Sequence, residues 1–494
     1  MSTITSTSGT EWEIVSGLEV HCELATATKL FCGCPNEFGA EPNTHVCPVC
    51  LGLPGSLPVL NERAVEYALR VGEAFGFDVP PQSIFHRKNY FYPDMPKNFQ
   101  TTQYDEPICV RGSLDVDGER IGITRAHLEE DTGKSTHLGG AGGRIHGASQ
   151  SLVDYNRAGV PLLEIVSEPD IRSAEQAAAY VDELRSTLKA IGVSDVKMEE
   201  GSLRVDANVS VRPVGSSAFG TRCEIKNLNS LKSLRDAIEY EARRQADLIE
   251  AGDEVKQETR LWNENLGHTA SMRSKEEAYD YRYFPEPDLV PVAPDDALRA
   301  QVRASMPELP AARRSRLIEE WGIGEAEAHT LLDVDGLADY AEAVRAAAPV
   351  SVPARDITNW ATQDVLAVVH EHAVALHLLD PSALAELLTL VADGSLSRNQ
   401  AKDVLEEMLV ENKRPSDIVA ERGLVQVSDT GALDAVLDEV FAANADAVAE
   451  WRAGDDKVRK KKRGFLMGEA MKALKGQGNP KLLNDLLDTK LTTS

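Results

Sequence analysis

Two close pairs of cysteines form the clearest chemical motif of the sequence. They are Cys32 with Cys34 and Cys47 with Cys50, and 12 residues separate the two pairs. Such spacing can bring four thiolates to one tetrahedral Zn²⁺ ion. Because four thiolates leave no open coordination position, we expect a structural zinc site and not a catalytic one. Four unrelated core cysteines are the alternative interpretation.

Carboxylates and a histidine form a second set, spread over several segments with strand-like alternation. Its members are Glu19, His21, Glu129, Glu130 and Glu164. A neutral imidazole and several carboxylates can hold Mg²⁺ and still leave positions for water and nucleotide oxygens. Each residue alone would be an ordinary solvated strand position. Their recurrence at the ends of separate predicted strands is what indicates a metal and phosphate site.

Three further segments could contact a nucleotide or RNA. Basic and aromatic residues interleave over residues 87–94, where a base could stack on a ring while Lys88 meets a phosphate, although a surface turn would look the same. The glycine-rich run Gly139–Gly147 matches no phosphate-loop spacing, so a flexible loop is the better interpretation. Between Asp455 and Lys481, nine basic residues stand against three acidic ones, which favours a phosphate-binding patch over a solvated helix face.

The elements that must position these residues are of two kinds. Strand-like alternation occurs in residues 12–21, 121–130, 160–166, 204–211 and 222–226. Asn61, Ser173 and Ser230 can each cap a helix between these strands. After a cluster of prolines that ends at Pro294, the pattern becomes helical, with expected helices at 298–320, 324–344, 356–378 and 382–390 and a second break near 412–415.

We therefore predict an α+β protein of three domains. Residues 1–295 would form a mixed α/β cradle, a catalytic domain built on a largely antiparallel sheet and carrying the zinc site. Residues 296–412 would form an all-helical domain, and residues 413–494 a small helical tail domain that binds RNA. The last assignment follows from the basic patch, which lies within this tail.

Composition and charge narrow the functional classes. The 494 residues carry 52 Lys and Arg against 79 Asp and Glu, a formal net charge of −27. A chain this acidic is not a general DNA-coating or membrane-coating protein, because such proteins need a basic face. The sequence has no uninterrupted apolar stretch of the ~18 residues that a membrane span needs, and no signal-peptide pattern. With an odd number of cysteines, seven, these features predict a cytoplasmic protein without a disulfide framework.

Two functional interpretations follow from these residues alone. One is an enzyme that uses ATP and Mg²⁺, with a structural zinc and an RNA-binding tail. The other is a non-catalytic nucleic-acid-binding or assembly module whose acidic face binds a partner.

Long motifs in a fixed order show a family resemblance. The sequence is similar to the GatB family, the B subunits of the aspartyl/glutamyl-tRNA(Asn/Gln) amidotransferases, over residues 17–21, 47–55, 87–94, 127–131, 156–165, 204–208, 224–227 and 280–288. Residues 464–481 resemble the C-terminal domain of that family. Because no large insertion separates the cradle from the helical region, the resemblance is to the bacterial type.

The resemblance implies an activity. Such proteins form a heterotrimer with an amidase (the A subunit) and a small protein (the C subunit), and the complex repairs misacylated Glu-tRNA(Gln) or Asp-tRNA(Asn). The amidase releases ammonia from glutamine or asparagine, and the GatB protein uses ATP and Mg²⁺ to phosphorylate the side-chain carboxylate, so that ammonia displaces phosphate and not oxide. The chain would thus be part of a carbon–nitrogen ligase of protein biosynthesis. A non-catalytic, zinc-containing, tRNA-binding scaffold of such a complex is the alternative.

The resemblance also implies roles for individual residues. Magnesium ligands would be Glu19, His21, Glu130 and Glu164, with Glu129 kept as an alternative because strand parity does not separate it from Glu130. ATP and substrate would be bound by Lys88, Asn208, Glu224 and Lys226. Zinc would be bound by Cys32, Cys34, Cys47 and Cys50. The tail would contact tRNA through Lys460, Lys461, Lys462, Arg463 and Lys472.

Overall fold

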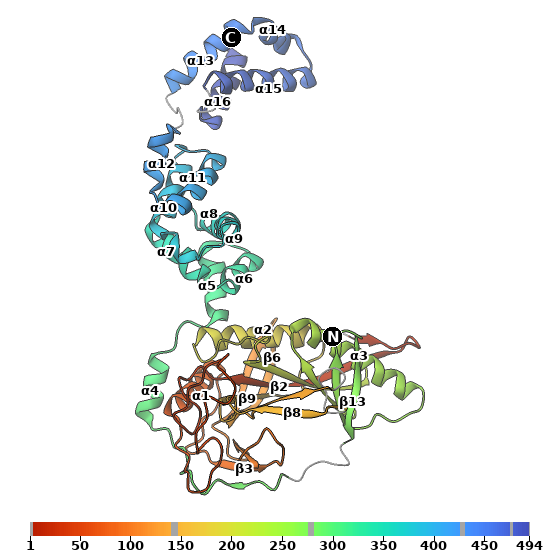
Figure 1. Cartoon of the computed structure of the whole chain (residues 1–494). Helices are drawn as coiled ribbons and strands as arrows, with labels where there is room; N and C mark the ends of the chain where they lie inside the picture. Colours follow the sequence, from red (N-terminus) through yellow and green to blue (C-terminus); the bar gives the residue numbers. More distant parts are fainter. Residues whose placement is uncertain (1–2, 140–146, 275–280, 425–429, 475–477, 494) are drawn as a thin grey trace. The chain divides into compact units, whose positions relative to one another are not determined.

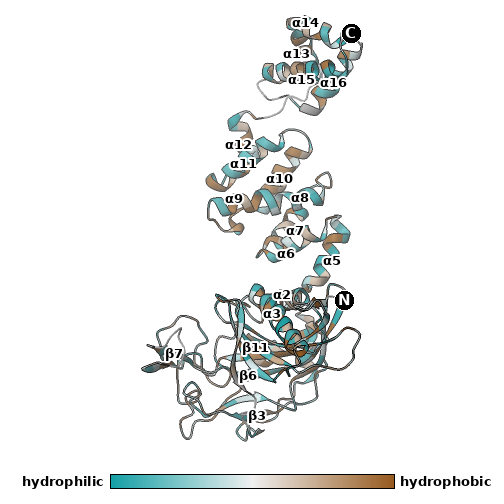
Figure 2. Ribbon diagram, turned by 90° about the vertical axis from the view of Figure 1, so that its right-hand side faces the viewer, coloured by the Kyte–Doolittle hydropathy of each residue, from teal (hydrophilic) through white to brown (hydrophobic). Residues whose placement is uncertain are grey.

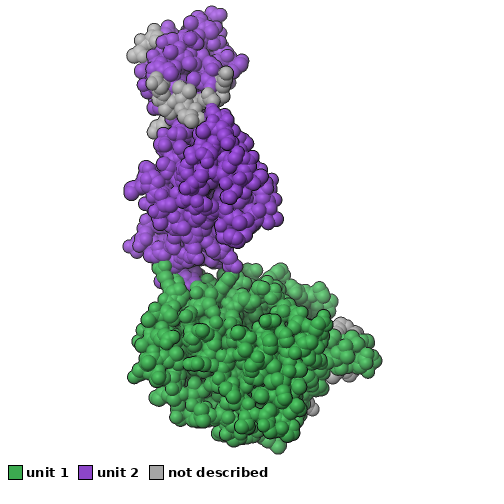
Figure 3. Space-filling model, turned by 60° about the vertical axis from the view of Figure 1, so that its left-hand side comes forward, with its two compact units in different colours: residues 1–309 green, residues 310–494 purple. Residues whose placement is uncertain are grey.

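The computed structural model describes residues 3–139, 147–274, 281–424, 430–474 and 478–493. The chain divides into two compact units, residues 1–309 and 310–494 (Figure 3). The first unit is built on strands with helices and the second on helices (Figure 1), so the predicted α+β class is confirmed. Within the described ranges, every helix is too short or too polar to span a lipid bilayer. Most of the glycine-rich run, residues 140–146, lies outside the described residues.

One large sheet organises the first unit. Its strands in spatial order are β13 (His268–Ser274), β12 (Glu258–Asn263), β11 (Cys223–Leu228), β10 (Leu203–Pro213), β2 (Glu11–Glu23), β9 (Pro161–Ser167), β6 (Glu119–Glu130), β4 (Phe99–Gln103), β3 (Phe85–Asn89) and β14 (Phe284–Pro285). Strand β1 (Thr3–Thr5) pairs with β2, and β5 (Cys109–Val116) pairs with β6. Only β11 and β12 run parallel among these described pairs, which confirms the predicted, largely antiparallel sheet. Strands β7 (Lys134–Leu138) and β8 (Gln150–Asp154) form a separate hairpin.

Three helices cover one face of this sheet. They are α1 (Glu62–Ala74), α2 (Ala174–Ala190) and α3 (Leu231–Glu250), and each begins at its predicted cap because Asn61, Ser173 or Ser230 accepts a first-turn N–H. Their buried side chains form one core with strand residues such as Leu18 and Val20. Since side chains alternate along a strand, Glu19 and His21 must point to the opposite face. The helices therefore leave that polar face available for the site.

The later helices depart from the predicted bounds: three of the four predicted helices are broken, and the one predicted at 382–390 is longer at both ends. They are α4 (Asp296–Ala304), α5 (Pro310–Trp321), α6 (Glu325–Asp333), α7 (Leu337–Ala347), α8 (Ala354–Asn359), α9 (Leu366–Glu371), α10 (Pro381–Ala392), α11 (Arg398–Glu411) and α12 (Pro415–Arg422). The predicted helix 298–320 is broken because Pro310 begins a new helix, and 324–344 is broken at Gly336, whose φ is 73°. The predicted helix 356–378 contains a π-helical turn, Trp360–Val365, and ends before Ala373, whose φ is 49°; a 3₁₀ turn, Leu376–Leu378, follows.

The second unit contains two hydrophobic cores. One joins buried residues from Leu317 to Val419, so helix α12 packs with α10 and α11. The other joins α13 (Thr430–Ala443), α14 (Ala445–Ala453), α15 (Asp456–Ala473) and α16 (Pro480–Thr493) through leucines such as Leu433 and Leu466. Figure 2 shows teal and brown alternating along these helices, as expected of amphipathic helices around a core.

A buried ion network fixes α3 against the β12–β13 hairpin at one edge of the sheet. Glu241 is fully buried and accepts hydrogen bonds from Arg244 at 2.6 Å, Gln245 at 2.9 Å and Thr269 at 3.0 Å, with Arg260 at 3.3 Å. Its carboxylate therefore joins α3 to the β12–β13 hairpin. Removing it would leave two guanidinium groups without their shared partner.

We predict that Glu241→Ala lowers the free energy of opening α3 by about 3–5 kcal/mol, the cost of breaking a buried ion pair. Glu239→Ala is the matched control, because Glu239 makes a half-exposed pair with Arg243 at 3.5 Å and its loss should cost at most about 1 kcal/mol. Hydrogen–deuterium exchange of the α3 amides measures both effects. Equal protection of α3 in the two variants would contradict the prediction.

Candidate active site and metal sites

Strand register brings most of the predicted carboxylate and histidine set together. His21 on β2 lies directly opposite Glu164 of β9 on one side and Arg204 of β10 on the other. Glu164 in turn lies opposite His127 of β6. Directly opposed residues in antiparallel strands point to the same face, so side chains distant in sequence meet on the face that the helices leave free.

The imidazole of His21 lies at the centre of this group. Its Nε2 is 3.4 Å from Glu164 Oε2, 3.5 Å from Glu129 Oε1 and 3.7 Å from Glu19 Oε1. Nε2 of His127 is 3.6 Å from the same Glu164 oxygen and 3.9 Å from Glu129 Oε2. These five residues, the His21 cluster, place three carboxylates around two imidazoles. Two overlapping triplets, Glu19–His21–Glu164 and His127–Glu129–Glu164, each have ligand atoms close enough together to hold a metal ion.

The structure separates the two adjacent glutamates of β6. Glu129 points into the His21 cluster and accepts a hydrogen bond from Thr102 at 3.3 Å. Glu130 points to the other side, where it pairs with Lys97 and accepts the Thr101 N–H at 2.7 Å. Adjacent residues of a strand must face opposite sides, so the two glutamates cannot both enter the cluster. The expectation that placed Glu130 beside Glu19, His21 and Glu164 is corrected accordingly: Glu129, the alternative, lies in the cluster.

Burial and mutual repulsion shape the ionisation of the cluster. Burial and the charge of Glu164 raise the pKa of Glu129 to about 7, and the same causes raise the pKa of Glu19. Burial would lower the pKa of His21, but its hydrogen bond to Glu164 and the three surrounding carboxylates raise it to about 9. Burial lowers the pKa of His127 to about 4, so this imidazole is neutral near pH 7. A neutral imidazole beside carboxylates can bind a metal ion.

A polar cavity of about 470 Å³ opens over the cluster. Its lining includes two cationic side chains among those predicted for nucleotide or substrate, Lys88 and Lys226. Burial would lower the pKa of Lys88, but Glu129, Glu164 and two nearby tyrosines together outweigh burial and raise that pKa. Lys226 Nζ lies 2.5 Å from Asp206 Oδ2 and 3.0 Å from Glu224 Oε1. The cavity thus has two ammonium groups next to a carboxylate-rich floor.

Asn208 and Glu224, the other two residues predicted to bind ATP or substrate, lie on the paired strands β10 and β11. Asn208 of β10 is directly opposite both Gly17 and Glu224, so it belongs to the same sheet face. Glu224 also accepts a hydrogen bond from Thr259 at 2.7 Å, which fixes its carboxylate beside Lys226. Neither residue is among the side chains that line the cavity in the described part of the chain.

Sequence reasoning missed several members of this face. They are His127, Asp131, Arg204 and Asp206. Arg204 and Asp206 continue the alternation that contains Asn208, and His127 precedes Glu129 by two positions, so the period-two signal was present. The sequence pattern does not contain the cross-strand register. Only that register brings Arg204 to Asp131, where a guanidinium N–H donates to Oδ2 at 2.6 Å.

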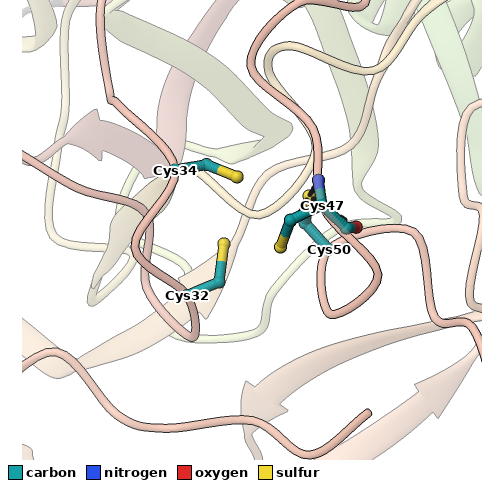
Figure 4. A group of neighbouring side chains, drawn as sticks. All are labelled: Cys32, Cys34, Cys47 and Cys50. Atoms are coloured by element: carbon teal, nitrogen blue, oxygen red, sulfur yellow. Dashed lines mark hydrogen bonds between the residues drawn. The ribbon is translucent and has the colours of Figure 1, made fainter.

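The four predicted zinc cysteines come together in the segment between β2 and α1. Their sulfur atoms all lie within 4.8 Å of one another, and Cys47 and Cys50 Sγ are 3.9 Å apart. Figure 4 shows the Cys32–Cys34 segment facing the Cys47–Cys50 turn. Four sulfurs around Zn²⁺ at about 2.3 Å stand about 3.8 Å apart. The arrangement therefore fits a four-thiolate metal site.

A buried lysine provides independent evidence for negative charge at these sulfurs. Lys29 is fully buried, and its Nζ donates to His45 O at 2.7 Å and Tyr155 O at 3.3 Å, with Cys50 Sγ at 3.8 Å. No carboxylate pairs with it anywhere in the described ranges. A hydrogen bond from Cys32 and the charge of Lys29 lower the pKa of Cys50 to about 5. A buried ammonium is stabilised by a nearby anion, and the thiolate of Cys50 can supply it.

The predicted tRNA-binding side chains lie on α15 or at its end. Lys460 and Lys461 are exposed, and Lys472 is 78% exposed. Lys462 and Arg463 already bind within the domain, to Glu450 at 2.6 Å and to Asp488 at 2.6 Å. The exposed lysines are therefore the ones available to an external phosphate.

Comparisons with known proteins identify the family of the chain. A family model described as the GatB/GatE catalytic domain matches residues 14–300, and one described as the GatB domain matches residues 340–491. The B subunit of the aspartyl/glutamyl-tRNA(Asn/Gln) amidotransferase of Myxococcus xanthus is 50% identical, covering 97% of this chain and 99% of that protein. Its counterpart in Moorella thermoacetica is 51% identical, covering 97% and 100%. The resemblance inferred from the sequence motifs is therefore confirmed: the chain belongs to the GatB family of the aspartyl/glutamyl-tRNA(Asn/Gln) amidotransferases.

Proposed function

We propose that the chain is the ATP-using subunit of a tRNA-dependent amidotransferase, which converts Glu-tRNA(Gln), Asp-tRNA(Asn) or both to the amidated forms. Its relatives carry the corresponding name. The observation that supports this function most strongly is the His21 cluster. Its three carboxylates converge in a cavity whose lining also includes Lys88 and Lys226. A passive RNA-binding scaffold has no need of such mutually repelling groups.

The chemistry explains why these residue types are needed. An oxygen of the side-chain carboxylate attacks the γ-phosphorus of ATP, and ADP leaves. Ammonia then attacks the carbonyl carbon and loses a proton, and phosphate departs with the original carboxylate oxygen. Mg²⁺ supplies charge neutralisation on the transferring phosphoryl group. Glu19, His21, Glu129 and Glu164 would hold the ion once His21 has lost its proton, and Lys88 and Lys226 would bind anionic oxygens of the nucleotide or substrate.

The cysteine cluster holds a structural zinc in this proposal. Four thiolates and Zn²⁺ together carry two negative charges, and the buried ammonium of Lys29 offsets one of them. Lys29 also ties the Cys50 turn to the backbone of His45 and Tyr155. The zinc therefore stabilises the loops beside β9 and takes no part in the reaction.

The tail domain binds the body of the tRNA in this proposal, as a third domain after the cradle and the helical domain. The reacting end must enter the cradle with ATP, so the rest of a tRNA has to be held elsewhere. Lysine contacts to phosphate give affinity without base specificity. The name of the relatives describes one subunit of several, which supports a multi-subunit complex. We propose that the other subunits are an amidase and a small third protein, and that the complex is cytoplasmic.

We predict about one zinc per chain, with four sulfur neighbours, by metal analysis and X-ray absorption. Cys47→Ser should lose the metal and with it the thermal stability of the first unit. Lys29→Met should keep the zinc but release it to a chelator about 10–100-fold faster, because outer-sphere partners tune metal affinity by such factors. Lys134→Met, an exposed control, should behave as wild type. Zinc-free protein prepared without chelator would disprove the site.

We predict that His21→Ala and Glu164→Ala abolish ATP-dependent amidation in the assembled complex. The loss should persist when ammonium chloride replaces glutamine, because the defect lies in carboxylate activation and not in ammonia supply. Glutamine hydrolysis by the partner should survive. Glu199→Ala removes an exposed carboxylate of the same unit and is the control. Near-normal amidation by either cluster variant would mean that the metal site is elsewhere.

We predict that the double variant Lys460→Ala, Lys461→Ala weakens tRNA binding and lowers the slope of log affinity against log salt by about 1.5, from two lost phosphate contacts. The rate at saturating tRNA should stay within about twofold, since the cradle is untouched. Lys256→Ala, an exposed lysine of the first unit, is the control. An unchanged salt slope with a lower saturated rate would contradict a docking role.

A further inference from the structure

An exposed tyrosine and a half-buried one form a stacked pair at the edge of the cradle. The rings of Tyr104 and Tyr283 are 4.1 Å apart between centroids and only 7° from parallel. Tyr104 directly follows β4 and Tyr283 directly precedes β14, so segments far apart in sequence build the pair. Tyr104 is 53% exposed, which leaves a large aromatic surface open to solvent. Neither tyrosine belongs to the hydrophobic core of the first unit.

The pair is continuous with the cradle through strand β3. His86 and Lys88 alternate to the same face of β3, where His86 meets the Tyr104 ring edge-on at 6.1 Å. The Lys88 ammonium lies 5.0 Å from the centre of the Tyr281 ring, and Tyr281 contacts Tyr283 edge-to-face at 6.0 Å. Lys88 also lines the cavity above the His21 cluster. Lys88 therefore lies between the His21 cluster and the tyrosine rings.

We propose that the Tyr104–Tyr283 pair is a stacking platform for an adenine ring. A third planar ring extends an existing stack at little cost, and every nucleobase has a suitable face. Adenine is favoured because the exposed carboxylate of Asp105, 3.2 Å from His86 Nε2, adjoins Tyr104. A carboxylate accepts from the amino group of adenine but repels the carbonyl oxygen at the equivalent position of guanine.

This inference rests on the proposed function and deepens it, because both substrates of that reaction carry adenine. One source is ATP, and the other is the terminal adenosine of the charged tRNA. In either case Lys88 lies between the base and the reacting phosphoryl group. The shared chemistry is an adenine nucleoside, and binding measurements separate the two sources without requiring turnover.

The test measures equilibrium binding to the purified complex that contains the full chain. Calorimetry compares ATP with tripolyphosphate, which has no base. Filter binding compares deacylated tRNA with the same tRNA lacking its terminal adenosine. The variants are Tyr104→Leu and Tyr104→Gln, which remove the ring, and Tyr104→Phe, which keeps it. Phe219→Leu is the matched control, since Phe219 is 66% exposed in the same unit.

We expect both ring-less variants to weaken binding of one adenine-bearing ligand about tenfold, while Tyr104→Phe and Phe219→Leu stay within about twofold. Weaker ATP with unchanged tripolyphosphate assigns the platform to ATP. Weaker intact tRNA with unchanged truncated tRNA assigns it to the terminal adenosine. Unchanged affinity for both ATP and intact tRNA in both ring-less variants would overturn the platform. An equal loss of tripolyphosphate or truncated-tRNA binding would also overturn it, because the defect would then not involve the base. Absence of amidation by the wild-type complex would instead count against the proposed function.

Discussion

Repulsion among three carboxylates is the interaction on which the first unit depends. Glu19, Glu129 and Glu164 all lie within 3.7 Å of one imidazole nitrogen, and two of them are buried. Left to themselves, such groups would take up protons or move apart; burial and the charge of Glu164 raise the pKa of Glu129 to about 7. The surrounding sheet prevents separation. A cation at this point therefore stabilises the arrangement, whether it is the proton on His21 or the metal ion proposed above.

The cysteine cluster also gathers groups that can carry negative charge, and there the basic partner is Lys29. There the thiols are gathered by two loops, and a fully buried lysine shows that the sulfurs are expected to be negative. Both sites combine several anions with one fixed basic group, His21 in the cradle and Lys29 at the cysteines. The cradle is open to a cavity and can exchange ligands, whereas four thiolates close their site. One site is thus suited to chemistry and the other to holding loops in place.

Local signals predicted the elements well, and the site less completely. The caps at Asn61, Ser173 and Ser230 were identified correctly because an N-cap is decided by a few neighbouring residues. Glu129 and Glu130 could not be separated, because both side chains are buried and hydrophobic alternation fails where both faces of a strand are enclosed. His127 and Arg204 were missed because their roles follow from which strands are neighbours, and sequence periodicity does not contain that register. The overlong helix at 298–320 was predicted because its apolar spacing continues across a pair of prolines.

If the cradle activates the side-chain carboxylate by phosphorylation, one oxygen atom of that carboxylate must leave with the phosphate. Glu-tRNA(Gln) carrying ¹⁸O in both side-chain carboxylate oxygens is amidated by the complex with ATP and ammonium chloride, and the released phosphate is examined by mass spectrometry. The account predicts one ¹⁸O in each phosphate released by amidation and one retained in the amide. Phosphate without ¹⁸O, from a reaction that still yields Gln-tRNA(Gln), would contradict it.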